Sequence, residues 1–341
     1  MNPAEPWVAT VMALILSAAL TPPLRRWLLD RGIVDAPDAR RSHVRVTARG
    51  GGLAILAAFS LTVLLTGGAG LEPLALAGFA ALLAALGWLD DRHDLPVAVR
   101  LAGMFACALG FVFYSGPVDV VEFYRVSLGW PWLWTGLAVI AVVWLINLHN
   151  FMDGSDGLAA MQGAWSGALL GGMLYRQGLD VPGLAGLALA GACLGFLLWN
   201  RPPARLFMGD SGSVLVGGLI GLLALTGAAS GAISIWVSLM VCAVFVVDAT
   251  ATLLSRAVRG ARWYTPHREH AYQRLIASGW THGQVLALYV GLNLVLGLPI
   301  LMLALWRPEL EGPLALLLIL TLAVGWNAVK RKTRPQETIN Q

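Results

Sequence analysis

Residues 132–157 read WLWTGLAVIAVVWLINLHNFMDGSDG, an apolar run that leads directly into acidic and glycine residues. The apolar part, residues 132–149, approaches the roughly 20 residues that a helix needs to cross a bilayer. Its apolar residues are continuous rather than alternating, which favours a helix over a barrel strand. Ionisable groups at the end of such a run are costly, so we expect Asp153 and Asp156 to bind something.

The rest of the chain repeats this succession of long apolar runs and short polar segments. Of its 341 residues, 57% are hydrophobic and only 12% are charged, whereas a soluble domain carries roughly 25% charged residues. We therefore predict an all-α fold, a polytopic membrane helical bundle of about 11 transmembrane helices in a single domain, residues 1–341. The expected spans are residues 7–25, 51–67, 71–89, 97–115, 132–149, 157–175, 181–199, 211–228, 233–254, 284–306 and 312–329.

The distribution of Lys and Arg predicts how this bundle is oriented. All but three of the 23 Lys and Arg residues fall in segments that alternate onto one side of the membrane. That side is expected to be the cytoplasm, with the N-terminus outside and the C-terminus inside. The cytoplasmic loops expected to form the functional site are residues 26–50, 90–96, 150–157, 200–210 and 255–283.

The C-terminal tail, residues 330–341, is basic. It either anchors the topology or rests on anionic membrane lipid. Because topology already accounts for the positive charge of the chain, we expect no nucleic acid among its partners.

Acidic residues gather at the ends of three spans, all on the expected cytoplasmic side. Asp90 and Asp91 end the third span, Asp153 and Asp156 follow the fifth, and Asp210 precedes the eighth. Adjacent aspartates repel each other unless a cation or a proton intervenes, and several carboxylates on one face favour a divalent metal with the phosphates it carries. Each cluster also has a structural interpretation, as a solvated loop or as a helix N-cap.

The second and third clusters have further features that favour binding. Asp153 and Asp156 are three residues apart, so both carboxylates project to one face if their turn opens the sixth helix. An N-cap accounts for one of these aspartates and leaves Asn150 unexplained. Near Asp210, the start of a helix offers free N–H groups to an anion, so we predict that Asp210 holds Mg²⁺ while the amides receive phosphate.

The longest cytoplasmic loop contains His267, Arg268 and His270. Two histidines three residues apart, with an arginine between them, are suited to grip a diphosphate or a nucleotide. An amphipathic surface helix that touches lipid headgroups explains the same residues equally well.

Two further charged residues lie within the expected spans. Asp248 is about two turns from the cytoplasmic end of the ninth span and shares a helix face with Thr252 and Arg256. A structural ion pair and a substrate contact are equally compatible with this position. Arg100, just inside the fourth span, is expected either to neutralise the carboxylates or to hold a lipid phosphate.

Taken in order along the chain, these motifs resemble those of the polyprenyl-phosphate N-acetylhexosamine-1-phosphate transferases, the superfamily of the enzymes MraY and WecA. The resemblance covers nearly the whole length of the chain. The residues that carry it are Arg41-Ser-His43, Arg49-Gly50-Gly51, Asp90-Asp91-Arg92, Asn150 to Leu158, Asn200, Phe207 to Ser213, Asp248 and His267-Arg268-Glu269-His270.

The resemblance implies a reaction in which undecaprenyl phosphate attacks the sugar-bearing phosphorus of a UDP-N-acetyl-sugar and UMP leaves. It implies the bacterial inner membrane as the location, Mg²⁺ as the cofactor with Mn²⁺ able to replace it, and it is compatible with a homodimer. Phosphoryl transfer of this kind depends mainly on positioning and charge neutralisation. By resemblance, the catalytic residues are Asp90, Asp91, Asp153 and Asp156, the metal ligand is Asp210, and the substrate-binding residues are Asn150, Asn200, His267, Arg268, His270, Arg49, Arg100 and Asp248.

Within this set the resemblance places Asp90 and Asp91 at the lipid phosphate, and Asp153 and Asp156 at the nucleotide or sugar. Asp91 acts either as a base or by positioning, since a phosphate with a second pKa of about 6 has little proton to lose near neutral pH. A double displacement with Asp156 as the nucleophile is an alternative, although direct attack by the lipid phosphate suffices.

The sequence departs from the MraY branch at two places. Asp94 occupies the position where that branch has a lysine, and the loop from His267 to His270 lacks its consecutive histidines. These departures argue against the peptidoglycan precursor as the substrate. They favour the branch that starts O-antigen from UDP-6-deoxy-N-acetylhexosamines such as FucNAc or QuiNAc.

A membrane transporter coupled to ions or protons is the rival interpretation, because it also places carboxylates in a helical bundle. A transporter is expected to show broken helices near the midplane and internal repeats. In this chain the acidic residues gather at the cytoplasmic ends of the spans, which favours an enzyme.

Overall fold

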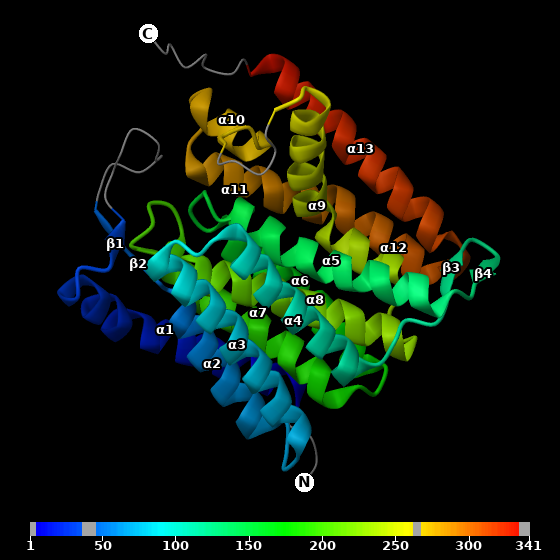
Figure 1. Cartoon of the computed structure of the whole chain (residues 1–341), viewed down its shortest axis with the longest axis horizontal. Helices are drawn as coiled ribbons and strands as arrows, with labels where there is room; N and C mark the ends of the chain where they lie inside the picture. Colours follow the sequence, from blue (N-terminus) through cyan, green and yellow to red (C-terminus); the bar gives the residue numbers. More distant parts are fainter. Residues whose placement is uncertain (1–4, 36–45, 262–266, 334–341) are drawn as a thin grey trace.

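The computed structural model describes residues 5–35, 46–261 and 267–333 and shows a bundle of long helices (Figure 1). Each of the eleven expected runs is helical. The long helices are α1 (Pro6–Asp30), α2 (Gly52–Thr66), α3 (Leu71–His93), α4 (Val97–Ser115), α5 (Pro131–Met152), α6 (Leu158–Arg176), α7 (Asp180–Asn200), α8 (Asp210–Ser230), α9 (Ile235–Val258), α11 (His282–Gly291), which continues through the π-helical η1 (Leu292–Gly297) into α12 (Leu298–Trp306), and α13 (Glu311–Lys332). The short elements are α10 (Ala271–Ala277) and the 3₁₀ turn η2 (Pro308–Leu310). Arg41 and His43, part of the expected site, lie outside the described residues.

Within the described ranges, nine helical segments are long and apolar enough to cross a membrane, which confirms a polytopic, all-helical membrane bundle. The other two expected spans, α2 and α6, do not meet this criterion. α2 has only 15 residues, fewer than the roughly 20 that cross a bilayer, and glycines together with Gln162 make α6 less apolar. By length and hydropathy, the described spans therefore number nine rather than eleven.

The centre of the bundle is formed by α7 and α8, whose most apolar stretches are 72% and 83% buried inside the protein. Small residues allow the helices to approach closely here, as is common where lipid gives no hydrophobic drive for association. A Cβ added at Gly171 would lie 2.6 Å from the backbone nitrogen of Leu187, and one added at Gly186 would lie 2.5 Å from the Cα of Gly171. These glycines bring α6 and α7 into backbone contact.

A small sheet at one end of the bundle positions the polar motifs. It consists of β1 (Val34–Asp35), β2 (Thr47–Arg49) and β5 (Leu206–Phe207), in the order β1-β2-β5. β2 runs parallel to β5 and places Arg49 opposite Phe207. The start of α8 follows β5 directly, so this pairing brings Arg49 to the N-terminus of α8.

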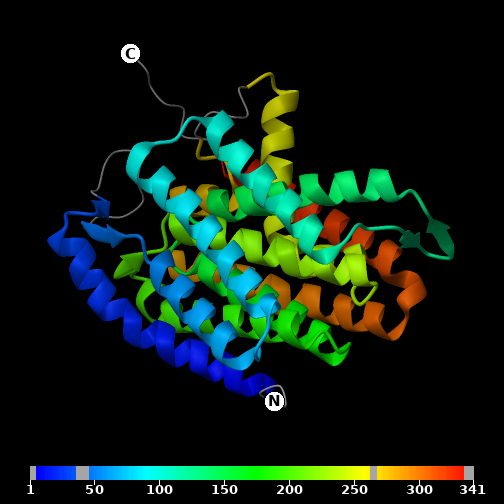
Figure 2. The same cartoon turned by 60° about the horizontal axis from the view of Figure 1, so that its bottom comes forward.

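A second small sheet, the hairpin of β3 (Val121–Phe123) and β4 (Val126–Leu128), lies at the opposite end of the bundle from β1 and β2 (Figure 2). It connects α4 to α5. The ends of α3, α5, α7 and α9 and the starts of α4, α6 and α8 all lie at the end that carries β2 and β5 (Figure 1). The acidic clusters predicted from the sequence therefore share one end of the molecule.

Candidate active site

Arg49 joins two of the predicted acidic clusters. A single guanidinium nitrogen, Nη2, lies 2.7 Å from Oδ1 of Asp91 and 2.7 Å from Oδ1 of Asp210. Burial by itself would lower the pKa of Arg49, but the charges of Asp210 and Asp91 outweigh it and raise that pKa. A permanently charged arginine is thus held between two carboxylates.

Asp91 caps the N-terminus of α8. Its Oδ1 accepts a hydrogen bond from the backbone nitrogen of Asp210 at 3.1 Å, and its Oδ2 accepts one from Ser211 at 3.0 Å. These N–H groups belong to the first turn of a helix, where no backbone partner exists. The side chain of Asp91 is only 4% exposed, so this carboxylate is enclosed and fully paired.

Two glycines make this cap possible. Gly209 has a φ of +72°, and a Cβ there would lie 2.9 Å from Oδ2 of Asp91. Gly87, one turn before Asp91 on α3, lies against the backbone of Asp210 and leaves no room for a Cβ. α3 and the start of α8 are therefore in direct backbone contact at the site.

Asp90, the other member of the pair, faces a different set of partners. Its Oδ2 lies 2.8 Å from Nη1 of Arg100, and its Oδ1 accepts a hydrogen bond from the backbone of Leu95 at 3.0 Å. Of the two roles expected for Arg100, the structure shows the neutralisation of a carboxylate. The repulsion expected between adjacent aspartates is relieved because each one pairs with its own arginine.

Asp210 and Asp153 are the more accessible carboxylates of the cluster. The side chain of Asp210 is 21% exposed, and nearby Asn150 donates a hydrogen bond to Ser213 on the same helix at 3.1 Å. Asp153 follows α5, and its carboxylate has no hydrogen-bond or ion-pair partner among the described residues. Burial, together with the charges of Asp210 and Asp91, raises the pKa of Asp153 well above its ordinary value despite the opposing effect of Arg49. The carboxylates in this part of the site outnumber its one arginine, Arg49, so negative charge is in excess.

A divalent cation is the kind of ion that would relieve this excess of negative charge. Within residues 5–35, 46–261 and 267–333, no group of three His, Cys, Asp or Glu side chains forms a complete metal site. Mg²⁺ does not need one, because it usually keeps several waters and binds through one or two carboxylates plus substrate phosphates. Asp210 and Asp153 offer oxygen donors that fit such an ion.

The carboxylate of Asp156 contacts partners that Asp153 does not share. The turn at residues 153–157 precedes α6 rather than opening it, so the two carboxylates do not share a helix face as they would if the turn were helical. Oδ2 of Asp156 accepts a hydrogen bond from the backbone of Ala204 at 2.9 Å. Its Oδ1 lies 3.6 Å from Nδ1 of His282. Asp156 therefore links this turn to the loop after α7 and to the start of α11.

His282, which no sequence pattern singled out, completes this link. Its Nδ1 lies 3.1 Å from the backbone nitrogen of Asp156 and 3.1 Å from Oγ of Ser155. The backbone N–H can only donate, so Nδ1 is the acceptor and carries no proton in this arrangement. A lone histidine at a helix start gave no signal in the sequence, because its partners are more than a hundred residues away.

Asn200 joins the turn at residues 153–157 to the loop that follows α7. Its Oδ1 accepts a hydrogen bond from the backbone of Gly157 at 3.0 Å, and its Nδ2 donates to the carbonyl of Leu206 at 2.9 Å. The residue is only 3% exposed. Because both ends of the amide are occupied inside the protein, Asn200 positions the turn at residues 153–157.

A second polar cluster surrounds Asp248 on α9. This buried carboxylate accepts hydrogen bonds from the backbone nitrogens of Ala271 at 2.7 Å and Tyr272 at 3.4 Å, which open α10. It also accepts from the hydroxyls of Tyr289 at 2.5 Å and Thr252 at 3.3 Å. The contact with Thr252 confirms their predicted shared helix face. Asp248 is thus a helix cap with a complete set of internal partners.

The predicted histidine loop, residues 267–270, directly precedes α10, the helix that Asp248 caps. The ring of His270 is only 2% exposed and lies between the rings of Phe151 and Tyr272, with the ring of His267 at 4.9 Å. Burial lowers the pKa of His270, and burial together with His270 and Arg256 lowers the pKa of His267 to about 4. Both histidines are therefore neutral at pH 7.

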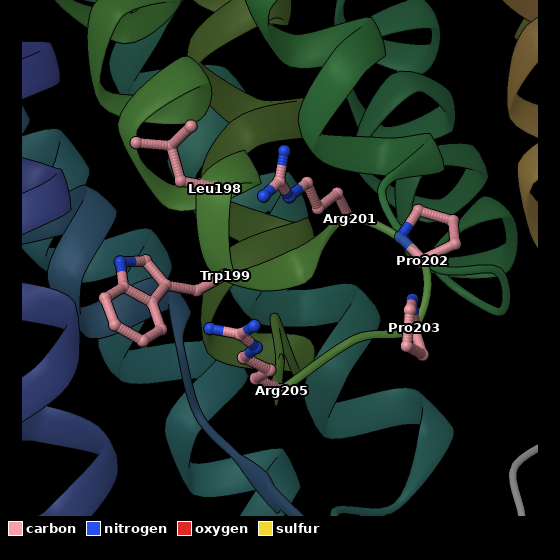
Figure 3. A pocket seen from close by; sticks show the side chains of 6 residues that line it. All are labelled: Leu198, Trp199, Arg201, Pro202, Pro203 and Arg205. Atoms are coloured by element: carbon pink, nitrogen blue, oxygen red, sulfur yellow. The ribbon is translucent and has the colours of Figure 1, made fainter.

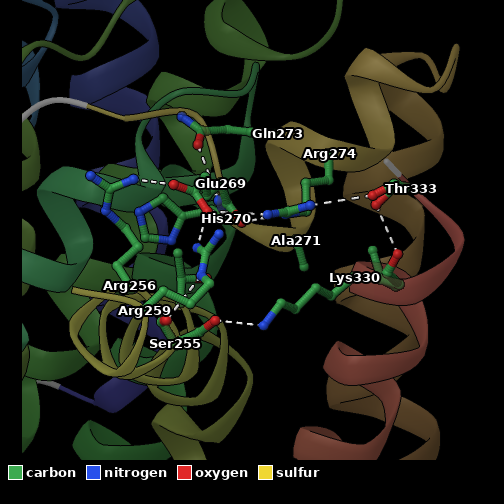
Figure 4. A network of polar contacts seen from close by, with 12 residues as sticks. Ser255, Arg256, Arg259, Glu269, His270, Ala271, Gln273, Arg274, Lys330 and Thr333 are labelled. Atoms are coloured by element: carbon green, nitrogen blue, oxygen red, sulfur yellow. Dashed lines mark hydrogen bonds and ion pairs between the residues drawn. The ribbon is translucent and has the colours of Figure 1, made fainter. Parts of the chain in front are cut away.

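Glu269, between these histidines, is surrounded by arginines (Figure 4). It pairs with Arg256 and Arg259 of α9 and with Arg274 of α10, whose Nη2 lies 3.2 Å from Oε2. Burial alone would raise the pKa of Glu269, but Arg259 and Arg256 outweigh it and lower that pKa. Arg256 thus has a carboxylate partner, which is Glu269 rather than Asp248.

The same network reaches the last helix. Arg274 donates a hydrogen bond to the carbonyl of Thr333 at 3.2 Å, and Nζ of Lys330 lies 2.5 Å from Oγ of Ser255 (Figure 4). Arg268, the only charged member of the predicted His-Arg-His grip, is exposed. Three arginines around one carboxylate leave an excess of positive charge, and with Arg268 they form a region suited to anions.

The geometry defines a membrane protein with a cluster of carboxylates and a cluster of arginines at one end of its bundle. The profile of glycosyl transferase family 4 matches residues 73–228 of the chain. A decaprenyl-phosphate N-acetylglucosaminephosphotransferase of Mycolicibacterium smegmatis is 32% identical over 307 residues, covering 77% of this chain and 74% of that protein. The chain therefore belongs to glycosyl transferase family 4, as the resemblance implied, and is a transferase.

Two other relatives are similar over comparable lengths. A probable undecaprenyl-phosphate N-acetylglucosaminyl 1-phosphate transferase of Bacillus subtilis is 29% identical over 83% of this chain and 81% of its own. A phospho-N-acetylmuramoyl-pentapeptide-transferase of Synechococcus elongatus is 31% identical over 84% of this chain and 83% of its own. The relatives include two N-acetylglucosamine phosphotransferases and one N-acetylmuramoyl-pentapeptide transferase. Because the chain is about equally identical to both kinds, sequence identity does not assign it to either.

Proposed function

We propose that the protein transfers an N-acetylhexosamine 1-phosphate from a UDP-sugar to undecaprenyl phosphate. An oxygen of the lipid phosphate forms a bond to the sugar-bearing phosphorus, the bond from that phosphorus to UMP breaks, and undecaprenyl-diphospho-sugar results. The observation that carries the proposal is the cluster of Arg49, Asp91, Asp210 and the unpaired Asp153 at one end of a membrane bundle. The names of the relatives support the same substrates.

Mg²⁺ is the proposed cofactor, with Asp210 and Asp153 as the residues that would hold it. When bound, the ion neutralises the charge of the phosphates, which otherwise repel each other and the carboxylates. Mn²⁺ prefers similar oxygen ligands and is expected to replace it. Arg49 holds Asp210 in place, because its guanidinium also contacts the capped carboxylate of Asp91.

Asp91 is proposed to act by positioning rather than as a base. Both of its oxygens accept backbone hydrogen bonds from α8, and it is almost completely enclosed. A lipid phosphate near neutral pH has little proton to lose. Asp90 pairs with Arg100. The carboxylate of Asp156 accepts a hydrogen bond from Ala204 and its backbone N–H donates to His282, which favours direct attack over a covalent intermediate on Asp156.

The arginine cluster is proposed to hold the diphosphate of the UDP-sugar. Arg268 is exposed and free to approach a phosphate, and Glu269 keeps Arg256 and Arg259 oriented. His267 and His270 are neutral, so they contribute hydrogen bonds rather than charge. Asp248 supports this region by capping α10.

We further propose that the site faces the cytoplasm of a bacterial inner membrane and that the product starts an O-antigen. The cytoplasmic orientation follows from the excess of Lys and Arg at this end of the bundle. Asp94 and the separated histidines of residues 267–270 favour a UDP-6-deoxy-N-acetylhexosamine such as UDP-FucNAc or UDP-QuiNAc as the donor.

The test is UMP release by the purified protein with Mg²⁺, undecaprenyl phosphate and a panel of UDP-N-acetyl-sugars. Release that depends on both the lipid and Mg²⁺ is expected, and the preferred donor identifies the branch. Omission of the lipid gives the background rate. A folded protein that releases no UMP from any donor would contradict the proposal and favour the transporter.

A further inference from the structure

A pocket of about 260 Å³ lies at the end of α7 and in the loop that follows it (Figure 3). None of the residues that line it belongs to the carboxylate cluster or to the arginine cluster described above. The lining residues are Leu198, Trp199, Arg201, Pro202, Pro203 and Arg205.

The charged groups of this pocket are two arginines. Arg201 and Arg205 are both exposed, and neither has an ion-pair partner among the described residues. Among the residues that the structure describes, no carboxylate lines the pocket. The guanidinium carbon of Arg205 lies 5.9 Å from the centre of the Trp199 ring, which holds this cation over an aromatic face. Arginines without counter-charges in a pocket favour an oxyanion, above all a phosphate.

The pocket is tied to the first helix. Nε of Arg25 on α1 donates a hydrogen bond to the carbonyl of Arg205 at 2.9 Å. The indole nitrogen of Trp199 donates to the carbonyl of Ala18, also on α1, at 3.3 Å. These contacts hold the residues that line the pocket against α1.

The position of the pocket at the end of an expected span suits a lipid headgroup. α7 ends here beside Ala18 of α1, and Trp together with Arg at the ends of spans is typical of the membrane interface. Leu198, which lines the pocket on the last turn of α7, is 51% exposed. Apolar surface thus adjoins the two arginines, as the chains of a bound lipid require.

We propose that this pocket binds the phosphate of an anionic phospholipid, with Arg201 and Arg205 at the phosphate and the acyl chains along Leu198 and α1. The proposal does not depend on the transfer reaction. The loop that carries both arginines also provides the backbone N–H of Ala204 to Asp156 at 2.9 Å. A bound headgroup therefore holds in place a loop that contacts the turn at residues 153–157.

The test is native mass spectrometry of the delipidated full-length protein with added phosphatidylglycerol or phosphatidylcholine. The wild type is expected to bind phosphatidylglycerol more tightly than phosphatidylcholine. The double variant Arg201→Gln/Arg205→Gln is expected to lose about 30-fold in affinity for phosphatidylglycerol, as for the loss of two cations beside an anionic surface.

The matched control is Arg125→Gln/Arg176→Gln, which removes two exposed arginines at the opposite end of the bundle. Like Arg205, Arg125 lies over an aromatic ring, that of Tyr124 at 5.4 Å. This control is expected to bind phosphatidylglycerol as the wild type does. If the double variant does not fold, the single change Arg205→Gln serves instead, with an expected loss of about fivefold.

Three results would overturn the proposal. The first is equal binding of the two lipids by the wild type. The second is a loss of affinity in the arginine variants no larger than in the control. The third is displacement of phosphatidylglycerol by glycerol phosphate at the same concentration, which would identify a soluble phosphate rather than a lipid as the ligand.

Discussion

Asp91 and Asp248 cap helices in the same way, but the regions around them carry opposite charge. Each is a buried aspartate on one helix whose two oxygens accept the first backbone N–H groups of another, α8 for Asp91 and α10 for Asp248. Around Asp91 one arginine, Arg49, faces several carboxylates, and the carboxylate of Asp153 has no partner within the described ranges. This region needs a cation.

Around Asp248 the balance is reversed. Glu269 is the carboxylate on which Arg256, Arg259 and Arg274 converge, and the neighbouring histidines are neutral. This region accommodates an anion. The difference teaches that helix capping fixes the backbone in both places, whereas the residues beside each cap determine the local charge. A metal-bound phosphate and a nucleotide diphosphate are the ligands that these two regions would hold side by side.

The largest effect on kcat is expected when the carboxylate region loses Asp210, the side chain proposed to hold the metal ion. Asp210→Asn should lower kcat by about 10³-fold, because a neutral amide neither attracts Mg²⁺ nor pairs with Arg49 as strongly. UMP release with lipid and Mg²⁺ measures it. Asp119→Asn, an exposed aspartate at the opposite end of the bundle, is the matched control. Normal turnover in Asp210→Asn would remove the metal from the mechanism.

A smaller effect is expected at the cap of the same region. Asp91→Asn retains one acceptor oxygen but loses the charge that pairs with Arg49, so α8 and Asp210 shift. We expect kcat to fall by about 10²-fold, as for a misplaced catalytic group, together with a lower Tm. A lower Tm separates this positioning role from the effect of Asp210→Asn. An unchanged kcat would show that Asp91 has no part in the reaction.

The link between the turn at residues 153–157 and α11 is expected to matter less. His282→Ala removes the acceptor for the backbone N–H of Asp156, and kcat/KM for the UDP-sugar should fall about tenfold, the cost of one hydrogen bond to a positioned group. His282→Asn places an amide oxygen near Nδ1 and should restore part of the loss, whereas His282→Gln should not. Equal kcat/KM in the Ala and Asn variants would argue against this role.

The smallest effect is expected on the pH dependence of stability, through His267 in the arginine region. The pKa of His267 is lowered to about 4 in the folded protein, whereas in the unfolded chain it is about 6.5. The unfolded state therefore binds more protons between these values, and stability falls as the pH drops through this window. His267→Gln removes this linkage, so its Tm should fall less than that of the wild type between pH 7 and pH 5. Equal decreases would contradict the lowered pKa.

Much of the fold could be predicted because the apolar runs are long and continuous, as in residues 132–149. The number of helices that meet the length and hydropathy criteria for a span was harder to predict, since α2 is short and α6 contains polar and glycine residues. At the site, Asp210 stood out because it directly precedes the apolar run of the eighth expected span. The capping by Asp91 could not be predicted, because it depends on close packing of α3 against α8.

Other parts of the site have no local signature. Asn200 and His282 act through backbone groups that are distant in the sequence. Glu269 lies between two histidines that attracted attention, but its role depends on arginines from α9 and α10. Patterns of spacing detect residues that share a helix face, such as Asp248 and Thr252, and miss those joined only by the folded chain.

The central claim is that the carboxylate region holds a divalent cation beside an anion-binding region, and titration with Mn²⁺ followed by electron paramagnetic resonance tests it most directly. The wild type and Asp119→Asn should bind one Mn²⁺ per chain, more tightly when the UDP-sugar is present. Asp210→Asn should lose this binding while remaining folded. Equal Mn²⁺ binding by Asp210→Asn and the wild type, or no effect of the UDP-sugar, would contradict the account.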